Sequence, residues 1–269
     1  MPRILLCNDD GYDSAGLHAL KNELDKIGEV FVFAPTIQRS WISKMISRYD
    51  IVSVKPAFHS NMNDQSNFYS VSGSPSDSCL IGAFNILDYT GKLPDLIVSG
   101  INTGANMGLS FILSSGTIAV SMEAAMMGIP SIAVSQFFQK KEHYVPEILN
   151  DIKSYEKTAR FSRIIAEKIL KKRKFPKGID FIIINVPYNV ENFDYRITRI
   201  ARIHYGYLFK KIGADTYKFN DKMTLSRYKD NVPEDSDVNV LLNYNKISIT
   251  PINLDLTGDM KKLIEFLGD

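Results

Sequence analysis

Two adjacent carboxylates stand where the first strand of the chain is expected to end. Asp9 and Asp10 follow the apolar run of residues 3–8 and precede Gly11. Neighbouring side chains of a strand point to opposite faces, but a turn at Gly11 can direct both carboxylates toward one point. Converging carboxylates need a cation or a shared proton, and oxygen donors without nitrogen or sulfur favour Mg²⁺ or Mn²⁺ over structural Zn²⁺. The alternative is that Asp10 caps the next helix and Asp9 is a solvated turn residue.

A glycine-rich loop offers a second group of polar atoms. Residues 99–108 read SGINTGANMG. Glycines let the backbone approach a ligand closely, and loop amides can cradle an anion. Asn102 and Asn106 add neutral oxygen ligands and amide donors. The loop has neither the Walker A pattern nor the dinucleotide fingerprint. It is either a ligand-binding loop or a loop whose turns simply require glycine.

Two more polar segments complete the set. Residues 114–117, SSGT, precede an expected helix whose free amides and dipole favour an oxyanion or a phosphate. The alternative is ordinary capping of that helix by Ser115 or Thr117. Residues 34–40, APTIQRS, follow the second expected strand. Because ligands bind beyond the carboxyl ends of parallel strands, we expect these segments to meet at one edge of the sheet.

An alternation of strands and helices positions these segments. Residues 3–8 and 30–35 are apolar runs, and residues 15–27 carry apolar side chains at helical spacing. Together they predict a βαβ unit with parallel strands. The alternation continues with helices expected at 77–87, 117–128 and 154–172 and strands at 94–100, 130–135 and 181–187. We predict an α/β fold, a Rossmann-like three-layer α/β/α arrangement around a mostly parallel sheet.

The pattern changes after Pro187. Residues 196–220 alternate apolar with polar side chains and contain Gly-Ala-Asp at an expected turn, which predicts a β-hairpin. A further strand is expected within 245–255 and a closing helix at 260–267. We divide the chain into a catalytic core (1–187), a β-hairpin extension (188–245) and a C-terminal strand and helix (246–269). The extension has little core of its own, so we expect it to pack on another subunit.

Composition and charge limit the class of protein. The net charge of the 269 residues is +2, which predicts neither a nucleic-acid nor a membrane partner. The basic residues 168–178 at a helix end are expected to be a solvated face. No apolar run reaches the roughly 18 residues of a membrane span, and no signal peptide is expected. Two cysteines make no disulfide scaffold, so we expect a cytoplasmic protein.

These segments together resemble the SurE (survival protein E) nucleotidases. The resemblance runs in order over nearly the whole chain. The pairing of a double-Asp block with a Gly-Ile-Asn loop is its most specific part. Its blocks are ILLCNDDGYDSAGLHAL, APTIQRSWIS, SGSPSDS, LPDLIVSGINTGANMG, SSGTIAVSMEAAMMGIPSIAVS, INVP and ISITPI.

The resemblance implies a role for each motif residue. One divalent cation per subunit, Mg²⁺ or Mn²⁺, would be bound by Asp9, Asp10, Ser40 and Asn102. Asn106 and the Ser115-Gly116-Thr117 turn would face the phosphate, and Asp9 or Asp10 would orient or deprotonate the attacking water. The implied activity is metal-dependent hydrolysis of nucleoside 5′-monophosphates, with 3′-monophosphates and short polyphosphate as further substrates. The implied assembly is a homodimer or homotetramer through the C-terminal arm.

Three positions depart from the pattern of that family. Trp41 stands where glycine is usual, Lys44 where asparagine is common, and Ser114 where tyrosine often precedes the turn. A bulky indole and a new cation near the mouth of the site are expected to change base preference, access or loop mobility.

Two other classes of protein are alternatives to a nucleotidase. A Rossmann-type oxidoreductase or nucleotide-sugar transferase is disfavoured because no Gly-x-Gly-x-x-Gly follows the first strand. A non-catalytic nucleotide-binding or stress-regulatory module would keep the fold and the phosphate loop, with Trp41 blocking turnover. Phosphatase activity with Mn²⁺, measured with and without a chelator, distinguishes this module from the enzyme.

Overall fold

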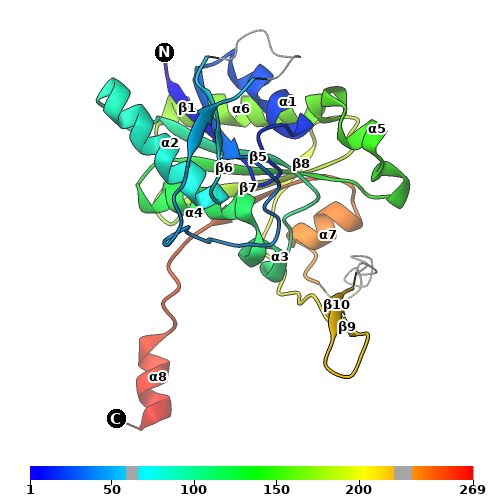
Figure 1. The fold of residues 1–269 in the computed structure, drawn as a ribbon. Coiled ribbons are helices and arrows are strands. Elements are labelled where there is room, and N and C mark those ends of the chain that lie inside the picture. Colours follow the sequence, from blue (N-terminus) through cyan, green and yellow to red (C-terminus); the bar gives the residue numbers. More distant parts are fainter. Residues whose placement is uncertain (59–65, 221–231, 269) are drawn as a thin grey trace.

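A nine-stranded sheet forms the centre of the protein (Figure 1). The computed structural model describes residues 1–58, 66–220 and 232–268. The strand order is β3-β4-β2-β1-β5-β6-β7-β11-β8. The strands are β1 (Arg3–Cys7), β2 (Glu29–Pro35), β3 (Val54–Pro56), β4 (Phe68–Val71), β5 (Leu96–Thr103), β6 (Ser131–Phe137), β7 (Phe181–Pro187), β8 (Tyr195–Ile197) and β11 (Ile247–Ile252).

The six strands from β4 to β7 in this order run parallel, and all of them except β4 were predicted from the sequence. Their apolar runs are buried because helices cover both faces of the sheet. β11 lies antiparallel to β7, and β3 lies antiparallel to β4. The predicted α/β fold with a mostly parallel sheet is therefore confirmed.

Helices form the two outer layers. On one face, α1 (Ala15–Leu24) packs beside α6 (Glu156–Lys172), and on the other, α2 (Pro75–Thr90) packs beside α4 (Gly116–Met126). Each layer shares a cluster of buried apolar side chains with the sheet. Burial of such side chains contributes about 25 cal/mol per Å² of apolar surface, which makes these layers the main source of stability.

Some boundaries differ from those expected. The helix expected at 77–87 begins two residues earlier, because Ser74 and Asp77 form a capping box and Pro75 occupies the first turn. The strand expected at 94–100 continues to Thr103. A register shift between Ser99 and Asn102 marks a β-bulge there, which carries the strand into the glycine-rich loop.

Successive strands of the chain are added on one side of β1 up to β4 and on its other side from β5 onward, so the order of addition reverses between β1 and β5. From β1 the chain continues to β2 and β4 on one side, whereas β5, β6 and β7 follow on the other. Open α/β sheets bind ligands at such a switch point, beyond the carboxyl ends of the strands. Asp9 and Asp10 follow β1, and Asn102 and Thr103 end β5, so both candidate segments lie there.

The C-terminal part of the chain contributes two strands to the large sheet and also forms elements outside it. β8 and β11 extend the sheet beyond β7, while β9 (Phe209–Lys211) and β10 (Tyr217–Phe219) form the predicted hairpin around Gly213. Helix α8 (Met260–Leu267) extends away from the body of the molecule (Figure 1). The proposed division at 187 and 245 stays a prediction, and residues 221–231 of it lie outside the described part.

The remaining elements are α3 (Leu109–Ser114), η1 (Lys141–His143), α5 (Pro146–Leu149), η2 (Ile152–Tyr155) and α7 (Asp237–Leu242).

Within the described residues, every helix is too short or too polar to cross a lipid bilayer.

Candidate active site

Asp9 is a buried carboxylate at the carboxyl end of β1. Only 3% of the residue is exposed, and its Oδ1 accepts a hydrogen bond of 2.6 Å from the Thr117 hydroxyl. Burial raises the pKa of Asp9 above its ordinary value, while hydrogen bonds from Thr117 and the Gly116 amide act in the opposite direction. The first turn of α4 therefore holds Asp9 in place.

Gly116 permits this close approach. A Cβ at Gly116 would lie 2.8 Å from the Cβ of Asp9 and 2.8 Å from the Cγ of Pro75. Any larger residue would therefore push the N-terminus of α4 away from the carboxylate. The glycine of the SSGT segment is therefore needed for the close contact with Asp9 and Pro75, in addition to the conformational freedom that it gives the backbone.

Asp10 is held by the neighbouring segments. Its Oδ2 accepts a 2.8 Å hydrogen bond from the Thr103 amide, and its Oδ1 accepts one of 3.1 Å from Gln38. Burial and the charge of Asp9 raise the pKa of Asp10 to about 7. The nearby carboxylate of Asp9 is therefore the second cause, after burial, of the raised pKa of Asp10.

The turn that separates the two aspartates from α1 is braced by Asn8. The Asn8 amide donates to the Gly11 carbonyl at 2.9 Å and to Ser14 Oγ at 2.7 Å. Gly11 has a φ of +103°, which a residue with a side chain rarely adopts. Asn8 and Gly11 together fix the direction in which Asp9 and Asp10 leave β1.

The glycine-rich loop carries both predicted asparagines to the same edge. The Asn102 amide donates to the Gly104 carbonyl at 2.6 Å. Asn106 is buried, donates from its side chain to Ser135 Oγ at 2.9 Å, and exchanges backbone hydrogen bonds of 2.9 and 3.0 Å with the side chain of Asn185. Asn185 was not among the predicted site residues. Its signal in the sequence is an amide inside the apolar run of β7.

One pocket of about 330 Å³ brings most of the predicted residues together. Asp9, Ser40, Asn102, Asn106 and Ser115 all line it. Asp10 lines an adjoining cavity of about 440 Å³ that also reaches Thr103.

Gly116 and Thr117 do not line this pocket. They lie buried behind Asp9, where the Thr117 hydroxyl is engaged by that carboxylate. The Ser115 side chain accepts from the Ile118 amide at 3.2 Å, which is the helix-capping role foreseen as the alternative.

The donor set of this edge is made of oxygen atoms. Two carboxylates, a hydroxyl and an amide suit a hard divalent cation, which also relieves the repulsion between Asp9 and Asp10. No group of three or more His, Cys, Asp or Glu side chains that could hold a metal occurs among the described residues. The residues present therefore fit Mg²⁺ or Mn²⁺ better than a zinc site with nitrogen or sulfur ligands.

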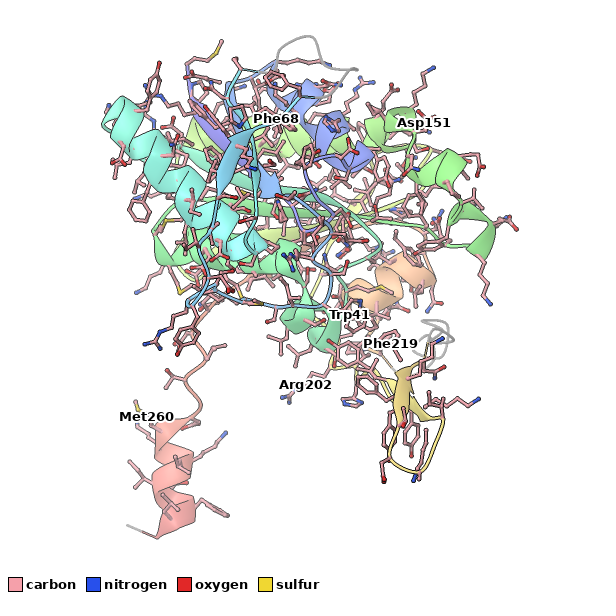
Figure 2. The ribbon with its side chains drawn as sticks, in the orientation of Figure 1. Trp41, Phe68, Asp151, Arg202, Phe219 and Met260 are labelled. Carbon is pink, nitrogen blue, oxygen red and sulfur yellow. The ribbon has the colours of Figure 1, made fainter. Side chains whose placement is uncertain are left out.

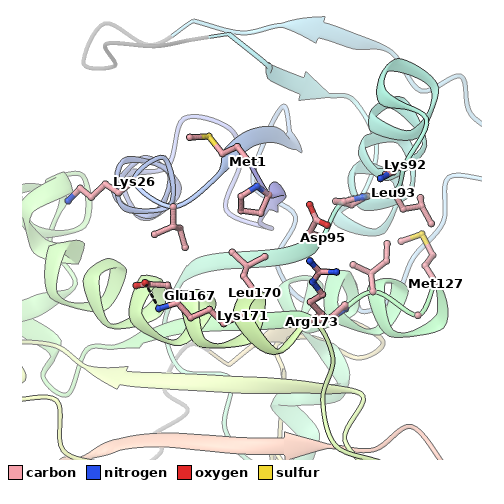
Figure 3. A pocket seen from close by; sticks show the side chains of 16 residues that line it. Met1, Lys26, Lys92, Leu93, Asp95, Met127, Glu167, Leu170, Lys171 and Arg173 are labelled. Atoms are coloured by element: carbon pink, nitrogen blue, oxygen red, sulfur yellow. Dashed lines mark hydrogen bonds and ion pairs between the residues drawn. The ribbon is translucent and has the colours of Figure 1, made fainter.

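A larger cavity, of about 950 Å³, lies at the opposite edge of the sheet (Figure 3). Pro2, Asp95 and Pro130 line it beside the strands' amino ends, together with side chains such as Lys171, which pairs with Glu167 at 2.9 Å. None of the predicted site residues lines it. Size alone therefore does not identify the reactive site.

Two of the three departures from the family pattern have a structural explanation. Lys44 was expected to add a cation near the mouth of the site, but it does not line the pocket, and its Nζ forms a 2.5 Å ion pair with the buried Glu123 of α4. Ser114 lines the pocket, and its hydroxyl donates to the Phe111 carbonyl at 3.2 Å.

The fold and the pocket define a Rossmann-like α/β protein with an oxygen-rich site at the switch point of its sheet. The chain belongs to the SurE family, because the family model described as Survival protein SurE matches residues 4–207. The 5′-nucleotidase SurE of Methanobrevibacter smithii is 32% identical over 98% of this chain and 99% of its own length. That of Methanothermobacter thermautotrophicus is 35% identical over 78% of this chain and 77% of its own.

A solved structure leads to the same family. The crystal structure of the SurE protein from Aquifex aeolicus matches with a TM-score of 0.77 at 30% identity and covers 100% of both chains. The resemblance inferred from the sequence motifs is therefore confirmed.

Proposed function

We propose that this chain is a metal-dependent phosphomonoesterase that hydrolyses nucleoside 5′-monophosphates to nucleoside and phosphate. The observation that carries the proposal is the single pocket lined by Asp9, Ser40, Asn102 and Asn106 at the switch point of the sheet. The relatives named 5′-nucleotidase SurE, similar over nearly the full chain, support the 5′-nucleotidase activity.

We assign the binding of one divalent cation, Mg²⁺ or Mn²⁺, to Asp9, Asp10, Ser40 and Asn102. When bound, the ion supplies Lewis-acid polarisation of a phosphate oxygen and lowers the pKa of a coordinated water. The support is the donor set: two carboxylates that repel each other, beside neutral oxygen ligands.

The residues of the chain orient the reactants. Asp9 or Asp10 orients the attacking water and accepts its proton as the water oxygen forms the new bond to phosphorus. The bond between phosphorus and the ribose oxygen breaks, and that oxygen takes up a proton from solvent to give the nucleoside. Thr117 keeps Asp9 in the rotamer that this step requires. Positioning of this kind supplies a large part of the rate enhancement in phosphoryl transfer.

Contacts to the phosphate are assigned to Asn106 and Ser115. Asn106 lines the pocket; Asn185 holds its backbone and Ser135 accepts a hydrogen bond from its side-chain amide, so its position is fixed before substrate arrives. Ser115 also borders the pocket. Gly116 and Thr117, for which the resemblance also implies phosphate contacts, stand behind Asp9, and we assign them to the support of that carboxylate.

A second copy of this chain is the proposed partner. The apolar side chains of α8 are exposed in a single subunit, and an exchange of the arm between subunits would cover them. We propose a homodimer or homotetramer built on this arm.

The test of the proposed function is a substrate panel. Phosphate release from nucleoside 5′- and 3′-monophosphates and from short polyphosphate is measured with Mg²⁺, with Mn²⁺, and with a chelator. We expect 5′-monophosphates to be hydrolysed fastest and the chelator to stop the reaction. Turnover of every nucleotide at an unchanged rate in the chelator would rule out the metal, and no turnover under any condition would leave a nucleotide-binding module as the better description.

A further inference from the structure

Trp41 occupies a strained position beside the proposed metal ligand Ser40. Its φ is +63°, in the left-handed region that a bulky residue rarely adopts. Such strain persists only where the surrounding structure holds it, and it gathers at functional sites. The residue lines the same pocket as Asp9 and Asn102, yet it remains 45% exposed.

Three aromatic rings hold the indole in this position. Phe111 of α3 lies 5.9 Å from it at an interplanar angle of 63°, and Tyr205 lies 5.2 Å from it at 46°. Phe219 of the hairpin lies 5.6 Å away at 72° (Figure 2). The ring centroids of Phe111 and Tyr205 also lie 5.0 Å apart, so two of the rings that hold the indole also contact each other.

None of the three rings stacks flat on the indole, because all three planes are strongly inclined to it. Edge and tilted contacts are favourable for aromatic pairs, so this arrangement stabilises the ring without covering it face to face. Together with the exposure of the residue, this leaves Trp41 able to receive another flat ring.

The pocket has a polar part and an aromatic part. Asp9, Asn102 and Asn106 form the first, and Trp41 forms the second with Phe111 and Tyr144. A volume of about 330 Å³ is in the range of small-molecule sites. A ligand that fills both parts carries an anionic group at one end and a flat apolar ring at the other, as a nucleotide does.

We propose that Trp41 is the residue on which the nucleobase stacks, and that it gives the enzyme a preference for purine over pyrimidine nucleotides. This inference rests on the proposed function, since it names the base-binding part of the same site. Purines present the larger ring surface to the indole, so they gain more from stacking and from burial of apolar area.

Direct binding to Trp41 can be observed without any catalysis. Trp41 is the only tryptophan of the chain, so intrinsic indole fluorescence reports on this residue alone. Adenosine, cytidine and ribose 5-phosphate are titrated into the wild-type protein in a chelator, with excitation at the red edge of the indole band. We expect saturable quenching by adenosine, weaker quenching by cytidine and none by ribose 5-phosphate. No quenching by adenosine, or equal quenching by ribose 5-phosphate, would overturn the proposal.

Kinetics separate stacking from a purely structural role. Base stacking on an aromatic side chain contributes on the order of a tenfold to hundredfold gain in affinity. In Trp41→Leu we expect KM for adenosine 5′-monophosphate to rise by about tenfold or more, while kcat/KM for ribose 5-phosphate is unchanged and Trp41→Phe recovers part of the loss. Equal losses for both substrates would show that Trp41 only supports the fold of the pocket.

A matched control is Tyr207→Leu. Tyr207 is 88% exposed and does not line the pocket, so this variant removes an aromatic ring near Tyr205 without touching the site. We expect wild-type constants for it. If the wild-type protein hydrolyses neither substrate, the proposed function fails, while the fluorescence titration still decides whether Trp41 binds a base.

Discussion

The hydroxyl of Thr117 donates a hydrogen bond of 2.6 Å to Oδ1 of Asp9 across 108 positions of sequence. It joins the end of β1 to the first turn of α4 at the switch point of the sheet. The resemblance to the SurE family implies a phosphate contact for Thr117, whereas in the structure its hydroxyl holds the carboxylate proposed to bind the metal. A hydrogen bond to a charged group is worth about 1.5–3 kcal/mol, enough to set the rotamer of Asp9.

Thr117→Val should therefore impair catalysis more than folding. The substitution removes the donor while nearly keeping the shape of the side chain, so Asp9 loses the group that orients it. We expect kcat/KM and the affinity for Mn²⁺ each to fall by about 10- to 100-fold, as for other residues that orient metal ligands. Steady-state kinetics and calorimetric titration of Mn²⁺ measure both, and Thr117→Ser should restore them. Unchanged constants in Thr117→Val would show that Asp9 needs no such support.

Lys44→Met should lower the stability of the protein. Lys44 pairs with Glu123, whose side chain is only 6% exposed, so its loss leaves a buried carboxylate without its partner. Breaking a fully buried pair costs about 3–5 kcal/mol. Because Lys44 itself is about one-third exposed, we expect a loss of about 1–2 kcal/mol in the free energy of unfolding, measured by urea denaturation.

The double variant Lys44→Met/Glu123→Gln is the control for this pair. Removing the buried charge together with its partner should recover most of the lost stability, and the double-mutant cycle gives the coupling energy. Additive losses in the cycle would mean that Lys44 and Glu123 do not interact.

The sheet could be predicted from the sequence because its central strands are continuous apolar runs. β1 and β7 coincide with the predicted segments at nearly every residue. The short strands β3 and β4 were missed, and β8 overlaps the predicted hairpin segment only at Arg196 and Ile197. All residues of β3 and β8 are exposed and β4 is short, so none of them forms a long apolar run. An edge strand is defined by its neighbour in the sheet, which a single sequence does not reveal.

Asp77→Asn should reduce the acid dependence of stability. The carboxylate of Asp77 is partly buried, which acts to raise its pKa, but hydrogen bonds from Ser47 and Ser74 hold that pKa below its ordinary value. Its contribution to stability is therefore fully present above the unfolded pKa of about 4 and is lost as the pH falls below it. We expect a loss of about 1 kcal/mol in the variant at neutral pH and a difference from wild type that shrinks toward pH 3, followed by urea denaturation. A difference that is constant over this range would contradict the assignment.

Leu263→Ser/Phe266→Ser should disrupt the assembly. Both side chains are more than half exposed on α8, at 56% and 85%, and helix α8 extends away from the body of the molecule (Figure 1). If a second subunit covers this apolar face, polar side chains there weaken the association. Light scattering should then give a smaller mass than for the wild type, with Glu265→Ala on the same helix as the control. An equal mass for all three proteins would place the interface elsewhere.

Some of the residues that make up the site could be predicted from the sequence. Asp9, Asn102 and Asn106 were predicted from polar segments after strands, Ser40 was implied by the resemblance to the SurE family, and one pocket contains all four. What the sequence could not show is which groups support them. The contacts of Asn185 with Asn106, and of Thr117 with Asp9, span 79 and 108 positions and depend on strand order and on the turn of α4. The same holds for the aromatic rings around Trp41, which come from α3, from the loop before β9 and from β10.

The most direct test of the account measures phosphate release from adenosine 5′-monophosphate with Mn²⁺ by Asp9→Asn and Asp10→Asn. Each variant keeps the size of its side chain but removes a charge that the proposed cation needs, and circular dichroism shows whether the fold is kept. We expect both folded variants to lose metal-stimulated activity by about a thousandfold. Full turnover by both variants would contradict a metal-dependent reaction at this pair of carboxylates.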